Sequence, residues 1–365
     1  MEHGNTVFFS CNQNFFTMKI PKSEIKKIAV FRALQLGDML CAIPALRALH
    51  HAYPEAEIIL LGLPWAQSLV DRFPNYIHKF KHFPCYPGLP EQKLDVKAFA
   101  KFLLEVQKEE YDLVLQMQGN GSIVNPMVEL FGGKYTAGFC LQNDYCADEN
   151  LFLTYPTGIH EIERHLALMN YLGIESQGTQ LEFPLHEKDY NELEALNLPI
   201  HPKEYVCVHP GSRGTWRQWP PNYFAELANY CAKQELTVVL TGTKDELNII
   251  DEVKNHLTTD PIIAAGKTSI GAVGVLIKNA ALLISNCTGV SHMAAAFATP
   301  GIVISMDGEP ERWGPLNKEL HRTIDWTKTA DFNLVLNELK HLLGTLQGNH
   351  SWNKTIAIAN EHFTD

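Results

Sequence analysis

The sequence predicts an α/β protein of two domains, each built on a parallel, doubly wound sheet. Short apolar runs that suit buried strands alternate with helical patterns in both halves of the chain. A polar stretch with several prolines, 175–202, separates the halves and suits a linker carrying one short helix. The 365 residues are enough for two hydrophobic cores.

We therefore expect five segments along the chain. They are an N-terminal extension at 1–25, a Rossmann-like domain at 26–174, the linker at 175–202, a second Rossmann-like domain at 203–330, and a C-terminal helix and tail at 331–365.

The first half opens with a strand pattern at 27–31. A helix follows from Gly37 to about His51, because its apolar residues recur at helical spacing. Pro44 falls inside this helix, where it is expected to start or kink the regular part. The same criteria predict strands at 57–61, 111–116 and 135–139, and helices at 96–108 and 162–171.

The second half alternates more regularly. Strands are predicted at 205–208, 236–241, 261–264, 280–284 and 301–305, and helices at 222–234, 245–256, 270–278 and 290–298. A last helix at about 332–343 is a candidate to pack back across both domains.

Composition excludes several classes of protein. A net charge of −11 argues against general nucleic-acid binding, which needs a basic surface. No apolar stretch is long enough to span a membrane, and residues 1–20 lack the apolar core of a signal peptide. The eight cysteines include no CxxC pair, so reduced thiols in the cytoplasm are expected, without zinc or a disulfide framework.

The most informative segment runs from Ser285 to Phe297. It follows an apolar strand pattern and leads into a helix whose first turn Thr288 and Ser291 can cap, while Gly289 allows a ligand to approach the backbone. A strand, a small polar turn and a helix N-terminus together form an anion site, because free N–H groups and the helix dipole point at one spot. We expect a nucleotide diphosphate to bind here.

A second turn of this kind starts at His209, after the strand at 205–208. Gly211 and Ser212 suit a phosphate-binding loop, and Arg213 and Arg217 offer fork-shaped donors for phosphate oxygens. Two such turns in one half of the chain reinforce each other.

The first half carries one candidate catalytic residue, Asp38, at the start of the helix that follows the first strand. It can be an N-cap or first-turn carboxylate that stabilises the helix, or a general base at the carboxyl edge of the sheet, and spacing alone favours the first of these. Gln118 and Asn120 follow another strand at the same edge, either as hydroxyl-binding groups or in a flexible glycine-containing loop. The segment 78–82 mixes basic and aromatic residues. It can be a solvated surface, or it can face an anionic acceptor or a membrane.

These motifs together resemble the heptosyltransferase family, glycosyltransferase family 9, whose members build lipopolysaccharide core and related glycans. The matching pieces run in family order over about 26–325: Leu36-Gly-Asp-Met-Leu40, Ile43-Pro-Ala-Leu46, Gln118-Gly119, His209-Pro-Gly-Ser212, Arg217-Gln-Trp-Pro220, Thr241-Gly242, Thr288-Gly-Val-Ser-His-Met-Ala-Ala-Ala296 and Glu311-Arg-Trp-Gly-Pro315.

The resemblance implies a GT-B fold, in which two Rossmann-like domains face a ligand cleft. It also implies an inverting, metal-independent sugar transfer from a nucleotide-diphosphate sugar, typically ADP-heptose, to a glycan or glycolipid acceptor, with no cofactor and with possible peripheral contact at the inner face of a membrane. The first domain would then take the acceptor, near Gln118 and Asn120, and the second the donor. The chain offers no DxD triplet for a metal ion.

The resemblance also assigns residues. Asp38 matches the family's base, and Arg217 stands where many members have lysine. The donor-binding positions that it implies are His209, Gly211, Ser212, Arg217, Thr241, Gly242, Cys287, Thr288, Gly289 and His292.

One position departs from the family, which usually has aspartate where this chain has Cys287. A thiol accepts hydrogen bonds from sugar hydroxyls poorly, so the donor sugar differs, another group substitutes, or activity is reduced. Cys287 and His292 could form a nucleophilic pair, although a small buried thiol is the simpler interpretation.

Three other functions compete with this one. Cys287 suggests a non-catalytic binder of nucleotide sugars. A nicotinamide dehydrogenase would need a GxGxxG after a strand, and the sequence has none. A sugar-nucleotide epimerase or hydrolase would differ by forming product without an acceptor.

Overall fold

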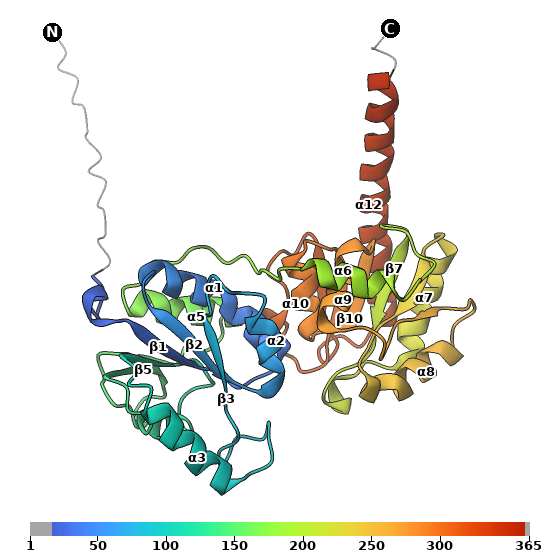
Figure 1. Ribbon diagram of the computed structural model, residues 1–365. Helices are drawn as coiled ribbons and strands as arrows, with labels where there is room; N and C mark the ends of the chain where they lie inside the picture. The colour runs from blue at the N-terminus through green and yellow to red at the C-terminus, as the bar shows by residue number, and fades with distance from the viewer. Residues whose placement is uncertain (1–16, 362–365) are drawn as a thin grey trace, which may run out of the picture.

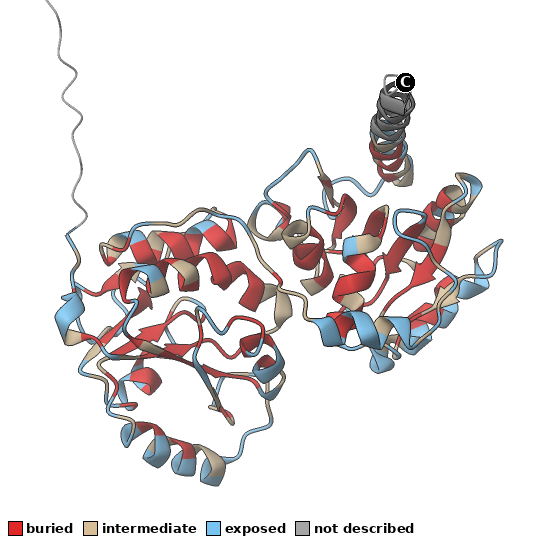
Figure 2. Cartoon of the chain, turned by 45° about the horizontal axis from the view of Figure 1, so that its top comes forward, coloured by how far each residue is buried: buried red, intermediate tan, exposed pale blue. Residues whose placement is uncertain are grey.

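The computed structural model describes residues 17–361 and contains two parallel six-stranded sheets, one in each half of the chain (Figure 1). This confirms the α/β fold class with two Rossmann-like domains. Buried residues concentrate in the sheets and in the helices that flank them (Figure 2).

The first sheet has the strand order β3-β2-β1-β4-β5-β6. Alternate residues of β1 point to opposite faces of the sheet, as expected for a strand that is buried on both sides. Ile28 packs in the core between the sheet and helices α1 and α5, and Phe31 packs in the core between the sheet and helices α3 and α4. The strands are β1 (Lys27–Phe31), β2 (Glu57–Gly62), β3 (Lys79–His82), β4 (Leu113–Gln116), β5 (Tyr135–Cys140) and β6 (Phe152–Thr154); the helices are α1 (Leu36–Ala52), α2 (Gln67–Val70), α3 (Val96–Gln107), α4 (Asn125–Glu129) and α5 (Glu161–Tyr171).

The second sheet has the order β12-β11-β10-β7-β8-β9. Helices α7, α8 and α12 share a core with one face, while α9 and α10 cover the other face, towards the first domain. The strands are β7 (Tyr205–His209), β8 (Thr237–Leu240), β9 (Ile262–Ile263), β10 (Leu282–Asn286), β11 (Gly301–Ser305) and β12 (His321–Asp325); the helices are α7 (Pro221–Lys233), α8 (Leu247–Asn255), α9 (Ile270–Asn279), α10 (Gly289–Ala296), α11 (Pro310–Trp313) and α12 (Phe332–Glu361).

The linker helix α6 (Glu187–Glu194) contacts both domains. It packs on α9, and its Asp189 accepts hydrogen bonds from both terminal nitrogens of Arg72 in the first domain, at 2.6 and 2.9 Å. Both side chains are buried, so this pair fixes the linker to the first domain.

Two expectations about the chain ends need correction. Ile20 and Ile25 are buried in the first core, so the packed part of this domain starts before residue 26; residues 1–16 lie outside the described chain. Over 332–346, the part of α12 whose side chains are described, the helix packs on the second domain and not across both, because its buried residues Val335, Leu339 and Leu342 join the core of the second domain.

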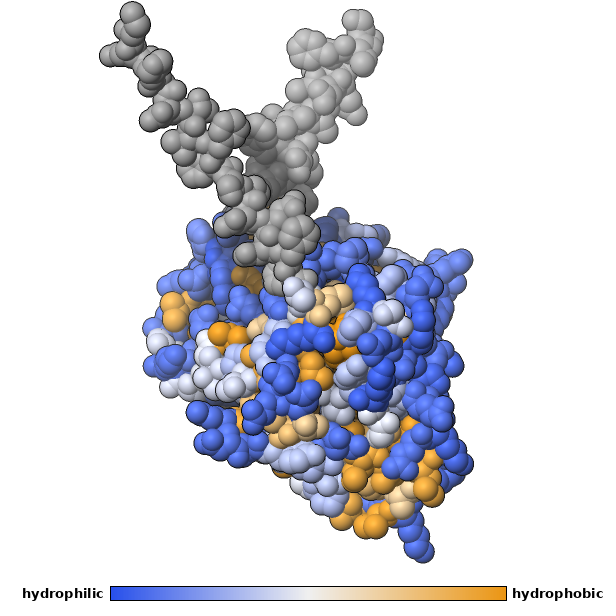
Figure 3. Space-filling view, turned by 90° about the vertical axis from the view of Figure 1, so that its left-hand side faces the viewer, coloured by the Kyte–Doolittle hydropathy of each residue, from blue (hydrophilic) through white to orange (hydrophobic). Residues whose placement is uncertain are grey.

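The surface of the first domain exposes apolar side chains near α3 (Figure 3). Leu94, Val96 and Leu104 are 50%, 68% and 63% exposed. No helix within residues 17–361 has the length and apolar character needed to cross a membrane.

Candidate functional site

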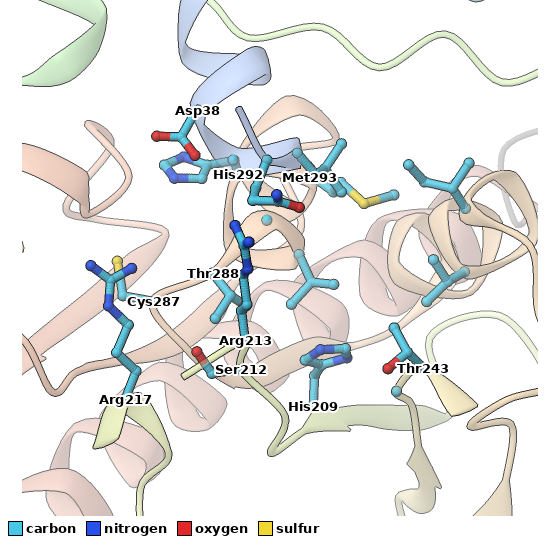
Figure 4. Close-up of a pocket in the computed structure, with 18 of the residues that line it drawn as sticks. Asp38, His209, Ser212, Arg213, Arg217, Thr243, Cys287, Thr288, His292 and Met293 are labelled. Atoms are coloured by element: carbon cyan, nitrogen blue, oxygen red, sulfur yellow. The ribbon is translucent and has the colours of Figure 1, made fainter. Parts of the chain in front are cut away.

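A cavity of about 620 Å³ lies between the domains, at the carboxyl ends of the strands (Figure 4). Parallel α/β sheets bind ligands at this edge. The cavity is lined by ten of the predicted site residues: Asp38, His209, Ser212, Arg213, Arg217, Gly242, Cys287, Thr288, Gly289 and His292.

Helices α1 and α10 meet across the domains at two glycines. A Cβ on Gly37 would stand 2.9 Å from Cδ2 of His292, and a Cβ on Gly289 would stand 2.9 Å from Leu36. Real Cβ atoms do not approach other atoms so closely, so a side chain at Gly37 would displace the buried His292 ring, and one at Gly289 would displace the Leu36 side chain. His292 therefore packs in the domain interface, with Nδ1 3.7 Å from Sγ of Cys41.

Asp38 lies in the first turn of α1 and lines the cavity above the second domain (Figure 4). Gln35 occupies the N-cap position, so of the two helix-stabilising roles that the sequence allowed, Asp38 has that of a first-turn carboxylate. Burial raises the pKa of Asp38, an effect that Arg32 opposes and Glu161 supports. A carboxylate with a raised pKa is a stronger base than one in water.

Behind Asp38 lies a buried cluster of charges that sequence reasoning did not identify. Arg32 donates to the Asp38 carbonyl from Nε and Nη2, at 3.1 and 2.8 Å, and its Nη2 lies 3.5 Å from Glu161. Glu161 also pairs with Arg164, with Arg312 of the second domain at 3.1 Å, and with His165 at 3.3 Å. Burial would raise the pKa of Glu161, but its hydrogen bond and electrostatic interaction with His165, together with the charges of Arg32 and Arg164, hold that pKa far below its usual value.

The turn after β7 forms one end of the cavity in the second domain. His209 lies 3.1 Å from Oγ1 of Thr241 and 3.9 Å from Glu246. Burial lowers the pKa of His209, and Glu246 partly opposes this. Two predicted residues of this turn region, Gly211 and Thr241, do not line the cavity. A Cβ on Gly211 would overlap the Glu246 carboxyl group, and Thr241 is buried beside His209.

The turn after β10 leaves the N-terminus of α10 accessible. Thr288 occupies the N-cap position, but its side chain makes no capping hydrogen bond, and Ser291 donates to the Thr288 carbonyl at 2.7 Å. The predicted side-chain caps are therefore wrong. Asn286 ties the two turns together, because it donates to the Pro210 carbonyl at 2.7 Å and accepts from the Trp219 amide at 3.0 Å.

Cys287 does not form a nucleophilic pair. Burial raises its pKa to about 12, so it is a protonated thiol at neutral pH. Burial lowers the pKa of His292 to about 4, and its ring contacts Gly37 and Cys41 in the interface, so it is a neutral packing residue.

The predicted acceptor-side residues do not line the cavity. Gln118 is buried and accepts a hydrogen bond from the Ala33 amide at 2.7 Å, so it holds the loop after β1 in place. Asn120 accepts from the Ser122 amide at 3.1 Å in its own turn. From the loop that follows β3, Glu91 reaches the cavity instead.

The segment 78–82 contains the edge strand β3. Its lysines pair with glutamates of neighbouring elements, Lys79 with Glu57 at 2.6 Å and Lys81 with Glu109 at 3.1 Å. Among the side chains described, those of residues 17–346, no three His, Cys, Asp or Glu group as metal ligands.

Comparison with known proteins places the chain in a family. Residues 99–334 match the model of glycosyltransferase family 9 (heptosyltransferase). Lipopolysaccharide heptosyltransferase 3 of Escherichia coli K12 is 26% identical over 302 residues, covering 78% of this chain and 83% of the relative. Lipooligosaccharide heptosyltransferase 2 of Haemophilus ducreyi is 22% identical over 322 residues, covering 80% and 87%.

Solved structures share the fold. A family 9 glycosyltransferase from Veillonella parvula has a TM-score of 0.69 at 19% identity, covering 84% of this chain and 87% of its own. The E. coli ADP-heptose lipopolysaccharide heptosyltransferase II also has a TM-score of 0.69 at 19% identity, covering 88% and 100%. The fold is therefore GT-B, and the match over 99–334 shows that this chain belongs to glycosyltransferase family 9, the heptosyltransferases.

Proposed function

We propose that this protein transfers heptose from ADP-heptose to a lipopolysaccharide-core or related surface-glycan acceptor, with inversion at the anomeric carbon and without a metal ion or cofactor. The observation that carries the proposal is the arrangement across the cavity: Asp38 of the first domain faces the turn at Ser212 and the α10 N-terminus of the second domain (Figure 4).

The second domain supplies the donor site in this proposal. The N–H groups at the start of α10, with Ser212 and Arg217, bind the diphosphate, because helix N-termini and guanidinium groups favour phosphate oxygens. Glu246 and Thr243 line the end of the cavity near His209, where a carboxylate can accept hydrogen bonds from ribose hydroxyls.

Asp38 is the general base in this proposal. It takes the proton of the acceptor hydroxyl while that oxygen bonds to the anomeric carbon from the face opposite the diphosphate. The bond between the anomeric carbon and the diphosphate oxygen breaks, and ADP leaves as an anion that Arg217 and the α10 amides stabilise. A positioned base typically contributes ~10²–10⁴-fold to the rate.

Calorimetry and a transfer assay test this function. ADP should bind more tightly than adenosine and more tightly than UDP, and ADP should form from ADP-heptose only when a core-type acceptor is present. Release of ADP without acceptor would indicate a hydrolase instead.

A second candidate is a binder of nucleotide sugars without transferase activity, which Cys287 favours because its thiol replaces the family carboxylate. Tight binding of ADP-heptose without turnover on any core-type acceptor would support this candidate.

We also propose that the acceptor is presented at an anionic membrane surface that contacts α3. The exposed Leu94, Val96 and Leu104 lie among exposed lysines at positions 93, 97, 101 and 108. The same segment also exposes Asp95, Glu105 and Glu110, and Lys101 pairs with Glu105 at 3.9 Å. Exposed apolar side chains can enter the interface of a bilayer, and the lysines beside them can reach anionic headgroups. The adjoining loop carries Glu91 to the cavity, so this contact would bring the cleft close to the bilayer.

Vesicle co-sedimentation tests the membrane contact. Binding to vesicles with phosphatidylglycerol should exceed binding to phosphatidylcholine alone and should fall with the double variant Val96→Ser, Leu104→Ser. Equal binding of wild type and variant would contradict it.

A further inference from the structure

The loop after β11 brings a carboxylate to the cavity at the end where Cys287 lies. The Cys287 amide donates to the Ile304 carbonyl at 2.8 Å, which places Cys287 beside the end of β11. Asp307, three residues after Ile304, lines the same cavity, and its side chain is 7% exposed.

The two oxygens of Asp307 have different surroundings. Oδ1 accepts hydrogen bonds from Oγ of Ser305 at 2.8 Å and from the Glu309 amide at 3.3 Å. Oδ2 lies 3.4 Å from Nη2 of Arg217 and accepts no hydrogen bond from the described residues. The loop therefore fixes the carboxyl group through one oxygen and leaves the other available to a ligand.

Position distinguishes Asp307 from the other carboxylates of the cavity. Asp38 belongs to α1 of the opposite domain, Glu91 to a first-domain loop, and Glu246 lies beside His209. Only Asp307, of the carboxylates lining the described cavity, lies beside Arg217 and the strand end that carries Cys287.

We propose that Asp307 binds the sugar of the donor, accepting hydrogen bonds from its hydroxyl groups in place of the carboxylate that position 287 lacks. This rests on the proposed function, which places the diphosphate at Arg217 and the transferred sugar next to it. A carboxylate beside a diphosphate is stabilised only if donors surround it, and Arg217 and sugar hydroxyls are such donors. Loss of such a charge-assisted bond should weaken sugar recognition about 10- to 100-fold.

The experiment separates the sugar from the nucleotide. Asp307→Asn keeps Oδ1 and its two hydrogen bonds but replaces the free oxygen with a donor group. We expect its affinity for ADP to stay within about 2-fold of wild type, whereas kcat/KM for ADP-heptose falls about 10- to 100-fold. Asp260→Asn, an exposed residue outside the cavity, is the matched control and should change neither value.

Rescue by a second carboxylate tests the substitution directly. In the Asp307→Asn background, Cys287→Asp should restore at least part of the lost kcat/KM for ADP-heptose. In the wild-type background, Cys287→Asp places two carboxylates side by side and should lower Tm, so the two changes should be strongly non-additive. If Asp307→Asn does not fold, Asp307→Ser is measured in the same way.

Three outcomes would overturn the proposal. Asp307→Asn could lose affinity for ADP and kcat/KM for ADP-heptose equally, which would make Asp307 a positioning residue for Arg217. Asp307→Asn could instead have unchanged kinetics, or Cys287→Asp could fail to restore kcat/KM in a folded double variant. Failure of the proposed function is distinct, because wild type itself would then neither bind ADP nor use ADP-heptose.

Discussion

Replacing Gly37 with alanine tests whether the contact between α1 and α10 sets the geometry of the cleft. The new Cβ would stand 2.9 Å from Cδ2 of His292 and 3.5 Å from Cα of Gly289. The His292 ring is 3% exposed and also contacts Sγ of Cys41 at 3.7 Å, so it has little room to move. Overpacking of this kind costs about 1–3 kcal/mol, which outweighs the at most ~1 kcal/mol gained in helix propensity.

Gly344→Ala is the matched control, because Gly344 also lies within a helix but a Cβ there meets nothing within 4 Å. The control should raise stability by about 0.5–1 kcal/mol, whereas Gly37→Ala should lower it by about 1–2 kcal/mol. Since Asp38 follows Gly37 directly, separation of the helices should also reduce kcat/KM, by up to ~10²-fold for a displacement of about 1 Å. Urea unfolding and initial rates measure both effects. A Gly37→Ala protein that gains stability as the control does, with unchanged kcat/KM, would refute this reasoning.

Three further predictions concern charge. Arg217→Ala should weaken the binding of ADP by about 1.5–3 kcal/mol and leave the binding of adenosine nearly unchanged. If calorimetry shows equal losses of affinity for both ligands, Arg217 does not bind the phosphates. Burial lowers the pKa of His292 from about 6.5 to about 4. The neutral ring therefore contributes its full stabilisation above about pH 6.5, and this contribution is lost as the pH falls towards 4. A urea unfolding midpoint that stays constant between pH 7 and pH 4.5 would disprove this. Glu161→Gln should lower the free energy of unfolding by about 3–5 kcal/mol, because the buried arginines lose their partner. It should also move the acid limb of the pH profile of kcat/KM to lower pH, since Glu161 raises the pKa of Asp38. The control Glu163→Gln, at an exposed position of the same helix, should have neither effect.

The regular elements could be predicted from local pattern because their burial is strong. The expected strands at 27–31 and 301–305 coincide with β1 and β11, and the helices at 222–234 and 270–278 lie within a residue of α7 and α9. The turns at Ser212 and Thr288 were also predicted to form one site, and both line the cavity.

The strands that sequence reasoning missed, β3, β6 and β12, lie at sheet edges. Edge strands are short and partly exposed, as the lysines of β3 illustrate, so their apolar pattern is weak. Gln118 was misplaced for a related reason: a polar residue after a strand can face a ligand or bind the backbone, and here it binds Ala33.

Long-range polar contacts were beyond local pattern. Glu161 meets Arg32 and Arg312 across 129 and 151 positions, as the difference in residue numbers gives, and Asp307 meets Arg217 only through the order of strands in the second sheet. A charged residue within an otherwise apolar stretch, as Arg32 is after β1, was the one available signal.

The central claim is that Asp38 acts as the base on a donor held by the second domain. The most direct measurement is the rate of ADP formation from ADP-heptose and a core-type acceptor, in the presence of EDTA, for wild type and Asp38→Asn, with ADP affinity measured on the same preparations. We predict turnover by wild type despite the chelator, a loss of at least ~10²-fold in Asp38→Asn, and equal ADP affinity in both. An Asp38→Asn protein that turns over at the wild-type rate, or that loses ADP binding in proportion to its activity, would contradict the account.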